Sequence, residues 1–128
     1  MSIIEAATKA MLLKKIKKAK WKQEVSTNKQ EEYSINGKAW FVGFNAYGYI
    51  KDSDTKNSDT WAWAFFEDRA DNDDNIENNL LETTIEGEYK EEVLFKAQEW
   101  LLANVDKAVE MWAKKYNPSQ QKTAKGNQ

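Results

Sequence analysis

The alternation of side-chain size between Thr60 and Phe66 constrains the fold more than any other segment. Large aromatic residues alternate there with alanines, in the order Trp61, Ala62, Trp63, Ala64 and Phe65. Because successive side chains of a strand point to opposite faces, the pattern predicts a strand with one bulky and one small face. Two interpretations are open. A neighbouring element packs closely on the alanine face, or the aromatic face is the core and the alanine face is open.

The C-terminal part of the chain has a helical pattern. Apolar residues recur at steps of three and four from Tyr89 to Tyr116, and Pro118 follows. This predicts one long helix. Near the N-terminus, Ser2 and Glu5 have the spacing of a capping box, which predicts a short helix. The lysine-rich segment 14–22 fits either a continuation of that helix or a short strand.

The dipeptide Asn36-Gly37 is typical of a two-residue hairpin turn and predicts pairing of Glu32–Ile35 with Lys38–Phe41. Leu80–Ile85 fits a short strand or the start of a helix. Together the segments predict an α+β fold, an antiparallel sheet of three to four strands with a short N-terminal and a long C-terminal helix packed on it. We expect one domain over residues 1–117 and a disordered tail over 118–128.

The chain of 128 residues contains no cysteine and no histidine. This excludes disulfides, thiolate nucleophiles, histidine general bases and the commonest zinc ligands. No acidic residue stands alone in an apolar run, where burial would raise its pKa. We therefore expect a non-catalytic protein that needs no cofactor.

The segment from Asp71 to Glu82 places oxygen-bearing side chains at the spacing of a calcium loop, but Ile76 stands where the sharp turn needs glycine. We interpret it as a solvated acidic loop and expect no metal site.

Charge is unevenly distributed along the chain. Seven lysines and one glutamate lie in residues 1–22, whereas acidic residues dominate 52–92. A basic and aromatic ligand site would use Lys17, Lys18, Trp21, Trp40 and Tyr47, with lysines on phosphates and rings on bases. Trp21 fits a core position equally well. A protein-binding acidic patch would instead use Glu67, Asp68, Asp71, Asp73 and Asp74. Both charged segments also fit merely solvated surfaces.

The N-terminal segment runs Glu5-Ala6-Ala7-x-x-Ala10-x-x-Leu13-Lys14-Lys15-Ile16-Lys17-Lys18-x-x-Trp21. It resembles the opening motif of a family of small phage proteins, the Tad2-like (DUF2829) proteins. The family's arginine pair falls on Lys17 and Lys18, and its glycine falls on Leu13. The resemblance implies a first helix that ends near Leu13, followed by a basic stretch that enters a sheet. It also implies a protein that counteracts a bacterial defence, in some relatives by trapping a nucleotide-derived signal.

We therefore expect a phage or mobile-element accessory protein that binds a host protein or sequesters a nucleotide ligand. A single-stranded nucleic-acid-binding protein and an acidic, immunity-type inhibitor of a toxin are the alternatives. With no apolar run of about 20 residues and no recognisable export signal, we expect the host cytoplasm and no membrane partner. The oligomeric state is open, and a homo-oligomer is possible.

Overall fold

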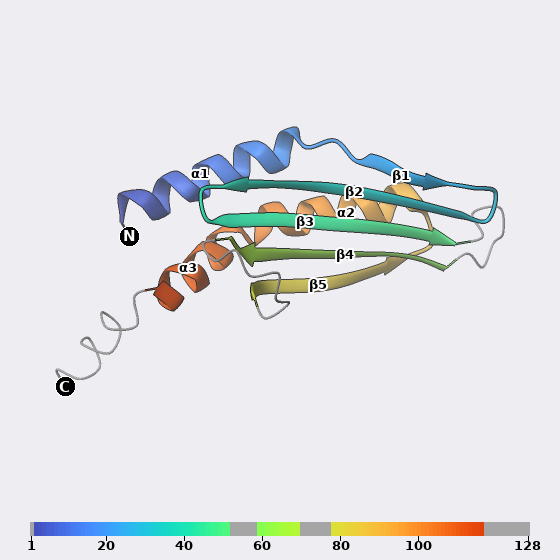
Figure 1. Cartoon of the computed structure of the whole chain (residues 1–128). Coiled ribbons are helices and arrows are strands. Elements are labelled where there is room, and N and C mark those ends of the chain that lie inside the picture. The colour runs from blue at the N-terminus through green and yellow to red at the C-terminus, as the bar shows by residue number, and fades with distance from the viewer. Residues whose placement is uncertain (1, 52–58, 70–77, 117–128) are drawn as a thin grey trace.

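The fold is α+β, and the described residues form a five-stranded antiparallel sheet and three helices. The computed structural model describes residues 2–51, 59–69 and 78–116 (Figure 1). The elements in chain order are α1 (Ile3–Lys18), β1 (Lys22–Ser26), β2 (Gln30–Ala39), β3 (Val42–Lys51), β4 (Asp59–Asp68), β5 (Asn79–Gly87), α2 (Lys90–Ala103) and α3 (Val105–Tyr116). The strands lie in the sheet in sequence order, and each pairs with the next.

The expected count of three to four strands was one strand too low. The additional strand is β1, in a stretch with little alternation, and its Lys22 pairs with Ser34 of β2. The segment Leu80–Ile85 is confirmed as part of strand β5.

The predicted hairpin turn at Asn36-Gly37 is wrong. Strand β2 runs straight through both residues, and the chain reverses at Trp40 and Phe41, so that Ala39 pairs with Val42. Trp40 carries the left-handed backbone conformation of this turn, with φ of 53°. Gly37 serves packing instead, because a Cβ there would lie 2.7 Å from ring atoms of Phe44.

The alanine face of β4 meets the helices, which confirms the first interpretation of the alternating segment. Ala62 and Ala64 are fully buried, and α2 packs over β4 and its two neighbours. Figure 1 shows the helices on one side of the sheet. Small residues are needed on this face because α2 lies close. At Gly48, a Cβ would collide with Leu94 of α2.

Helix α1 begins with the predicted cap and continues beyond the predicted end. The Ser2 hydroxyl accepts a hydrogen bond from the Glu5 amide at 3.2 Å. Leu13 permits the helix to continue where glycine would end it, so the lysine-rich stretch is helical as far as Lys18. The Gln98 side chain of α2 then donates to the carbonyls of Ile16 and Ala19, at 2.7 and 3.0 Å.

The C-terminal helix is interrupted at Asn104 rather than continuous. Asn104 leaves helical geometry, with φ of −114° and ψ of 11°, and its side chain donates to the carbonyl of Trp100 at 2.8 Å. After the break, α3 packs against α1. The Lys9 ammonium lies 3.9 Å from carboxylate oxygens of both Asp106 and Glu110 on α3.

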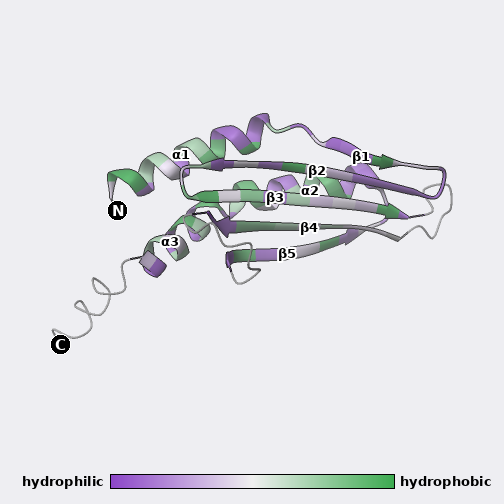
Figure 2. Ribbon diagram, viewed as in Figure 1, coloured by the Kyte–Doolittle hydropathy of each residue, from purple (hydrophilic) through white to green (hydrophobic). Residues whose placement is uncertain are grey.

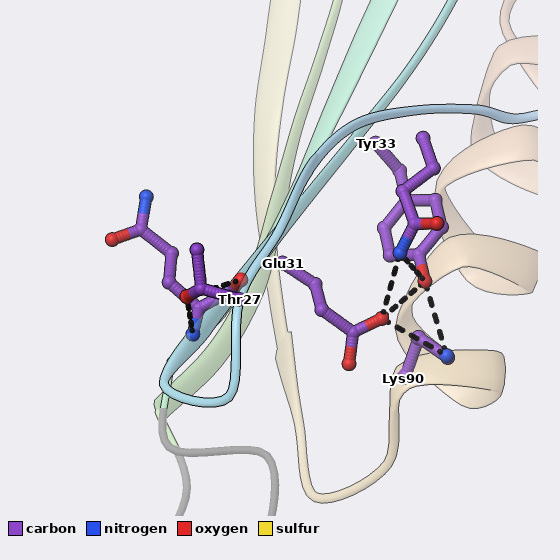
Figure 3. Close-up of polar contacts among 6 residues, drawn as sticks. Thr27, Glu31, Tyr33 and Lys90 are labelled. Atoms are coloured by element: carbon purple, nitrogen blue, oxygen red, sulfur yellow. Dashed lines mark hydrogen bonds and ion pairs between the residues drawn. The ribbon is translucent and has the colours of Figure 1, made fainter.

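Two polar clusters fasten the ends of the sheet to the helices. At one end, the buried carboxylate of Asp68 accepts a hydrogen bond from the Tyr116 hydroxyl at 2.6 Å and lies 3.0 Å from the Lys115 ammonium. At the other end, Lys90 donates to Glu31 at 3.3 Å and to Tyr33 at 3.1 Å (Figure 3).

In the cluster of Glu31, Tyr33 and Lys90, the pKa values of Tyr33 and Lys90 are both raised. Burial raises the pKa of Tyr33, and its hydrogen bond to Glu31 acts in the same direction. The hydrogen bond to Tyr33 raises the pKa of Lys90, with the Glu31 carboxylate contributing further. The cluster therefore joins β2 to the start of α2 as long as both protons are held.

Within the described ranges, no helix is long and apolar enough to cross a membrane. The expected tail over 118–128 and most of the candidate calcium loop, residues 71–77, lie outside the described residues.

Candidate binding site

The sheet face opposite the helices carries a row of aromatic side chains at its centre. We call this face the open face, since none of the described helices lies on it. The row consists of Tyr47, Tyr49, Trp61, Trp63 and Phe65. Register pairs Tyr49 with Trp61 and Tyr47 with Trp63, with ring centroids 5.3 and 6.0 Å apart and planes within 30° of parallel. These cross-strand pairs follow directly from the strand alternation of β4.

A hollow of about 400 Å³ lies beside this row, toward β1 and β2. Its lining combines the five residues of the row with Tyr33, Gly48 and two carboxylates, as follows: Glu24, Glu32, Tyr33, Tyr47, Gly48, Tyr49, Trp61, Trp63 and Phe65. Among the described residues, its two charged lining residues are therefore both acidic. A surface of this composition attracts a cation, because ring faces and carboxylates both carry negative potential.

Strand register and a bulge bring the two carboxylates together. Glu32 lies directly opposite Tyr49. Glu24 lies at the irregularity between Gln23 and Val25 in β1, where the pairing shifts by one residue. There its Oε1 atom accepts a hydrogen bond of 2.8 Å from the Ser34 hydroxyl. Ser34 itself is buried.

Further carboxylates border the row on its other sides. Glu82 of β5 accepts a hydrogen bond from the Trp63 indole nitrogen at 3.1 Å, and the exposed Glu86 lies opposite Trp61. Glu67 is partly neutralised by Arg69, at 2.6 Å, and also accepts from Asn45 at 3.0 Å. The open face thus presents aromatic rings within an acidic rim, in which Lys22 lies beside Glu24 and Arg69 beside Glu67.

A second, basic hollow of about 520 Å³ lies between α1 and the edge of β2. Its residues are Met11, Lys14, Lys15, Lys18, Ala19, Asn36, Gly37 and Phe44. We call it the lysine groove. Figure 2 shows the last turns of α1 in the colour of hydrophilic residues. The Lys15 ammonium is engaged, because it donates to the carbonyl of Lys38 at 2.7 Å.

The structure does not bring the five predicted ligand residues together. Lys17 and Lys18 are exposed on α1, and Lys18 lines the lysine groove. Trp21 packs against the core, and its indole nitrogen is buried with no hydrogen-bond partner among the described residues. Trp40 is half exposed in the β2–β3 turn. Tyr47 belongs to the open face, on the other side of the sheet from that core.

The five residues of the predicted acidic patch are not brought together either. Glu67 borders the open face and is paired with Arg69, whereas the side chain of Asp68 is buried against Lys115 and Tyr116. Asp71, Asp73 and Asp74 lie outside the described residues. Sequence reasoning missed Glu24, Glu32 and Glu82, since strand register alone places them beside the rings. The available signal was the alternation at 61–65, whose aromatic side proved to be the outer one.

Over residues 2–51, 59–69 and 78–116, no group of three or more His, Cys, Asp or Glu side chains is arranged to hold a metal ion. No family model matches the chain, and no match to it was found among curated proteins or solved structures. The resemblance of residues 5–21 to Tad2-like proteins therefore stays a prediction.

Proposed function

We propose that this chain is a non-catalytic binding protein whose open face docks onto a positively charged surface of another protein. The observation that supports this most directly is the hollow beside the aromatic row, in which Glu24 and Glu32 are the charged residues among the described lining. Tyrosine and tryptophan are typical of the centres of protein interfaces, and a charged rim around them is typical of the periphery.

The charge of the open face determines which class of partner it attracts. Glu82 and Glu86 extend the acidic rim along β5, and both are exposed. A phosphate-rich partner would be repelled by these groups, whereas lysine and arginine side chains would be attracted. The open face therefore favours a basic protein over a nucleic acid. The lack of cysteine and histidine throughout the sequence supports a binding role rather than a catalytic one.

Site-specific photo-cross-linking tests this function. A photoreactive amino acid replaces Thr84, exposed on the open face opposite Trp63, or Glu99, exposed on α2, as the matched control. In host-cell lysate we expect Thr84, and not Glu99, to cross-link a basic protein. The purified partner should then bind the parent chain and lose affinity with Glu82→Lys combined with Glu86→Lys. Cross-links from Glu99 alone, or unchanged binding by the double variant, would contradict the proposal.

A second candidate function rests on the lysine groove. Lys14 and Lys18 line it together with the apolar side chains of Met11 and Phe44, a composition that suits an anionic ligand with an apolar part, such as a nucleotide. Replacing Lys14 and Lys18 by glutamate should abolish binding of such a ligand and leave the melting temperature within a few degrees, since both side chains are exposed. Retained binding would exclude the groove.

The biological setting is proposed from the resemblance alone. Residues 5–21 suggest a phage accessory protein that acts against a host defence, and a protein that covers a basic host surface would suit that role. In this setting the open face would act as a plug on a nucleic-acid-binding or otherwise basic host protein. If this setting is right, the parent chain should protect phage from the host defence, and the variant with Glu82→Lys and Glu86→Lys should not. That result would connect the anti-defence role with binding at the open face.

A further inference from the structure

We propose that the hollow beside the aromatic row accommodates an arginine side chain of the partner. This inference rests on the proposed function and specifies the group that the open face recognises. Two features of the hollow support it: the free oxygens of its two carboxylates, and the tyrosine rings that line it.

The carboxylates retain acceptor capacity. Glu24 uses Oε1 for Ser34 and for the Lys22 ammonium, which lies 3.9 Å away. Glu32 uses Oε2 for the Gln30 amide. The second oxygen of each carboxylate makes no hydrogen bond or ion pair to the described residues. Two free oxygens on neighbouring strands match a donor group with several N–H bonds in fixed directions.

The tyrosine rings supply a stacking surface. One side of the Tyr47 ring meets Trp63, and one side of the Tyr49 ring meets Trp61. Both tyrosines line the hollow together with Glu24 and Glu32. A cation above a ring is attracted by the negative potential of the ring face, and the more so the further it is desolvated.

Arginine fits this combination better than lysine. The guanidinium group is planar, carries five N–H donors and is weakly hydrated, so it stacks on a ring and binds carboxylates in the same pose. The lysine ammonium is compact and strongly hydrated, and it would lose more hydration on entering the hollow. Lys22 supports this distinction, because it remains exposed beside Glu24 and does not line the hollow.

Short peptides test the inference without knowledge of the partner. Hexamers of arginine, of lysine and of citrulline are titrated into the protein, with affinity from calorimetry and location from NMR shifts of Tyr47 and of the Trp63 indole. Citrulline has the shape of arginine without its charge. We expect arginine to bind at least about fivefold more tightly than lysine and to shift both signals, and citrulline to bind weakly. Equal affinity of the arginine and lysine peptides would overturn the inference, as would shifts confined to other surfaces.

Matched variants assign the effect to the two carboxylates. Glu24→Gln with Glu32→Gln removes both charges and keeps one acceptor oxygen on each side chain, so the sheet should fold normally, as checked by its melting curve. Glu91→Gln with Glu99→Gln removes the same charge from two exposed positions of α2, away from the open face. The first pair should abolish the preference for arginine, and the second should retain it. Retained preference in the first pair would overturn the inference. The proposed function would still stand if Thr84 cross-linked a basic protein, and would fail separately if it did not.

Discussion

Gly37 offers a sharp test of the hairpin, because a turn role and a packing role predict different responses to substitution. In the structure Gly37 lies inside β2, and an added methyl would sit 2.7 Å from two ring carbons of Phe44. Ordinary carbon–carbon contacts are about 3.5–4.0 Å, so the overlap is about 1 Å. The Phe44 ring is almost fully buried, which leaves it little freedom to move away.

The magnitude of Gly37→Ala is the sum of two opposing effects. Overpacking of a close-packed core costs about 1–3 kcal/mol. The loss of chain entropy in the unfolded state offsets about 0.4–1 kcal/mol of this. We expect a net loss of about 1–2 kcal/mol in the free energy of unfolding, which corresponds to a melting temperature lower by about 4–8 °C in a chain of this size.

A double-mutant cycle with Phe44→Leu identifies the cause. Urea unfolding of the four proteins should show a coupling energy of about 0.5 kcal/mol or more, because the smaller leucine relieves the overlap. Additive effects would refute the packing explanation. Trp40→Gly is the complementary change, since Trp40 rather than Gly37 has the left-handed conformation. Glycine should be tolerated there without loss of stability, whereas a loss of about 1 kcal/mol would indicate an ordinary strand residue.

Three further predictions concern stability. Trp100→Ala should cost about 3 kcal/mol in urea unfolding, because Trp100 packs on the core beside Phe66, and native-like stability would show that its contacts are dispensable. Tyr116→Phe should cost about 1 kcal/mol by losing the hydrogen bond to Asp68, whereas Tyr89→Phe, at an exposed site, should cost nothing measurable. The folded state holds the protons of Tyr33 and Lys90 more tightly, since both pKa values are raised. Their stabilisation is therefore complete below about pH 10 and is lost as the pH rises through the raised values. With Lys90→Met, the melting temperature should fall less steeply above about pH 10 than in the parent chain. An unchanged dependence on pH would show that the cluster of Glu31, Tyr33 and Lys90 does not cause the fall.

Local patterns in the sequence predicted those elements whose own residues determine them. The capping residues Ser2 and Glu5 start α1, and the alternation in β4 identifies a strand without reference to the rest of the chain. Strand β1 was not predictable in this way, because Val25 is its only large apolar residue and the pairing with β2 makes it a strand. The hairpin was misplaced because Asn36-Gly37 fits a turn locally, while the position of Phe44 across the sheet requires glycine for packing.

The binding site was less predictable than the fold. The aromatic half was visible in the sequence, since Trp61 and Trp63 had to share a face. The acidic half depends on long-range pairing, because Glu32 comes to lie opposite Tyr49 and a bulge turns Glu24 toward Ser34. A shift of register by one residue would place these carboxylates on the helical face. No local pattern determines that register.

The close approach of α2 to the sheet explains why the β4 rings of the aromatic row lie on the open face. Because these rings also stabilise the fold, a binding test that removes one of them is difficult to interpret. The large inner residue of β4 is Phe66, which packs beside Trp100 of α2. Because α2 lies close at Ala62 and Ala64, the large side chains of Trp61, Trp63 and Phe65 lie on the outer face. There they also stabilise the fold, because each cross-strand aromatic pair contributes about 0.5–1.5 kcal/mol. A change such as Trp63→Ala would thus lower stability and binding together. The carboxylates separate the two effects, since Glu24 and Glu32 line the hollow but contribute little to the core. A variant of these residues that melts normally and no longer binds a basic partner would assign recognition to the hollow.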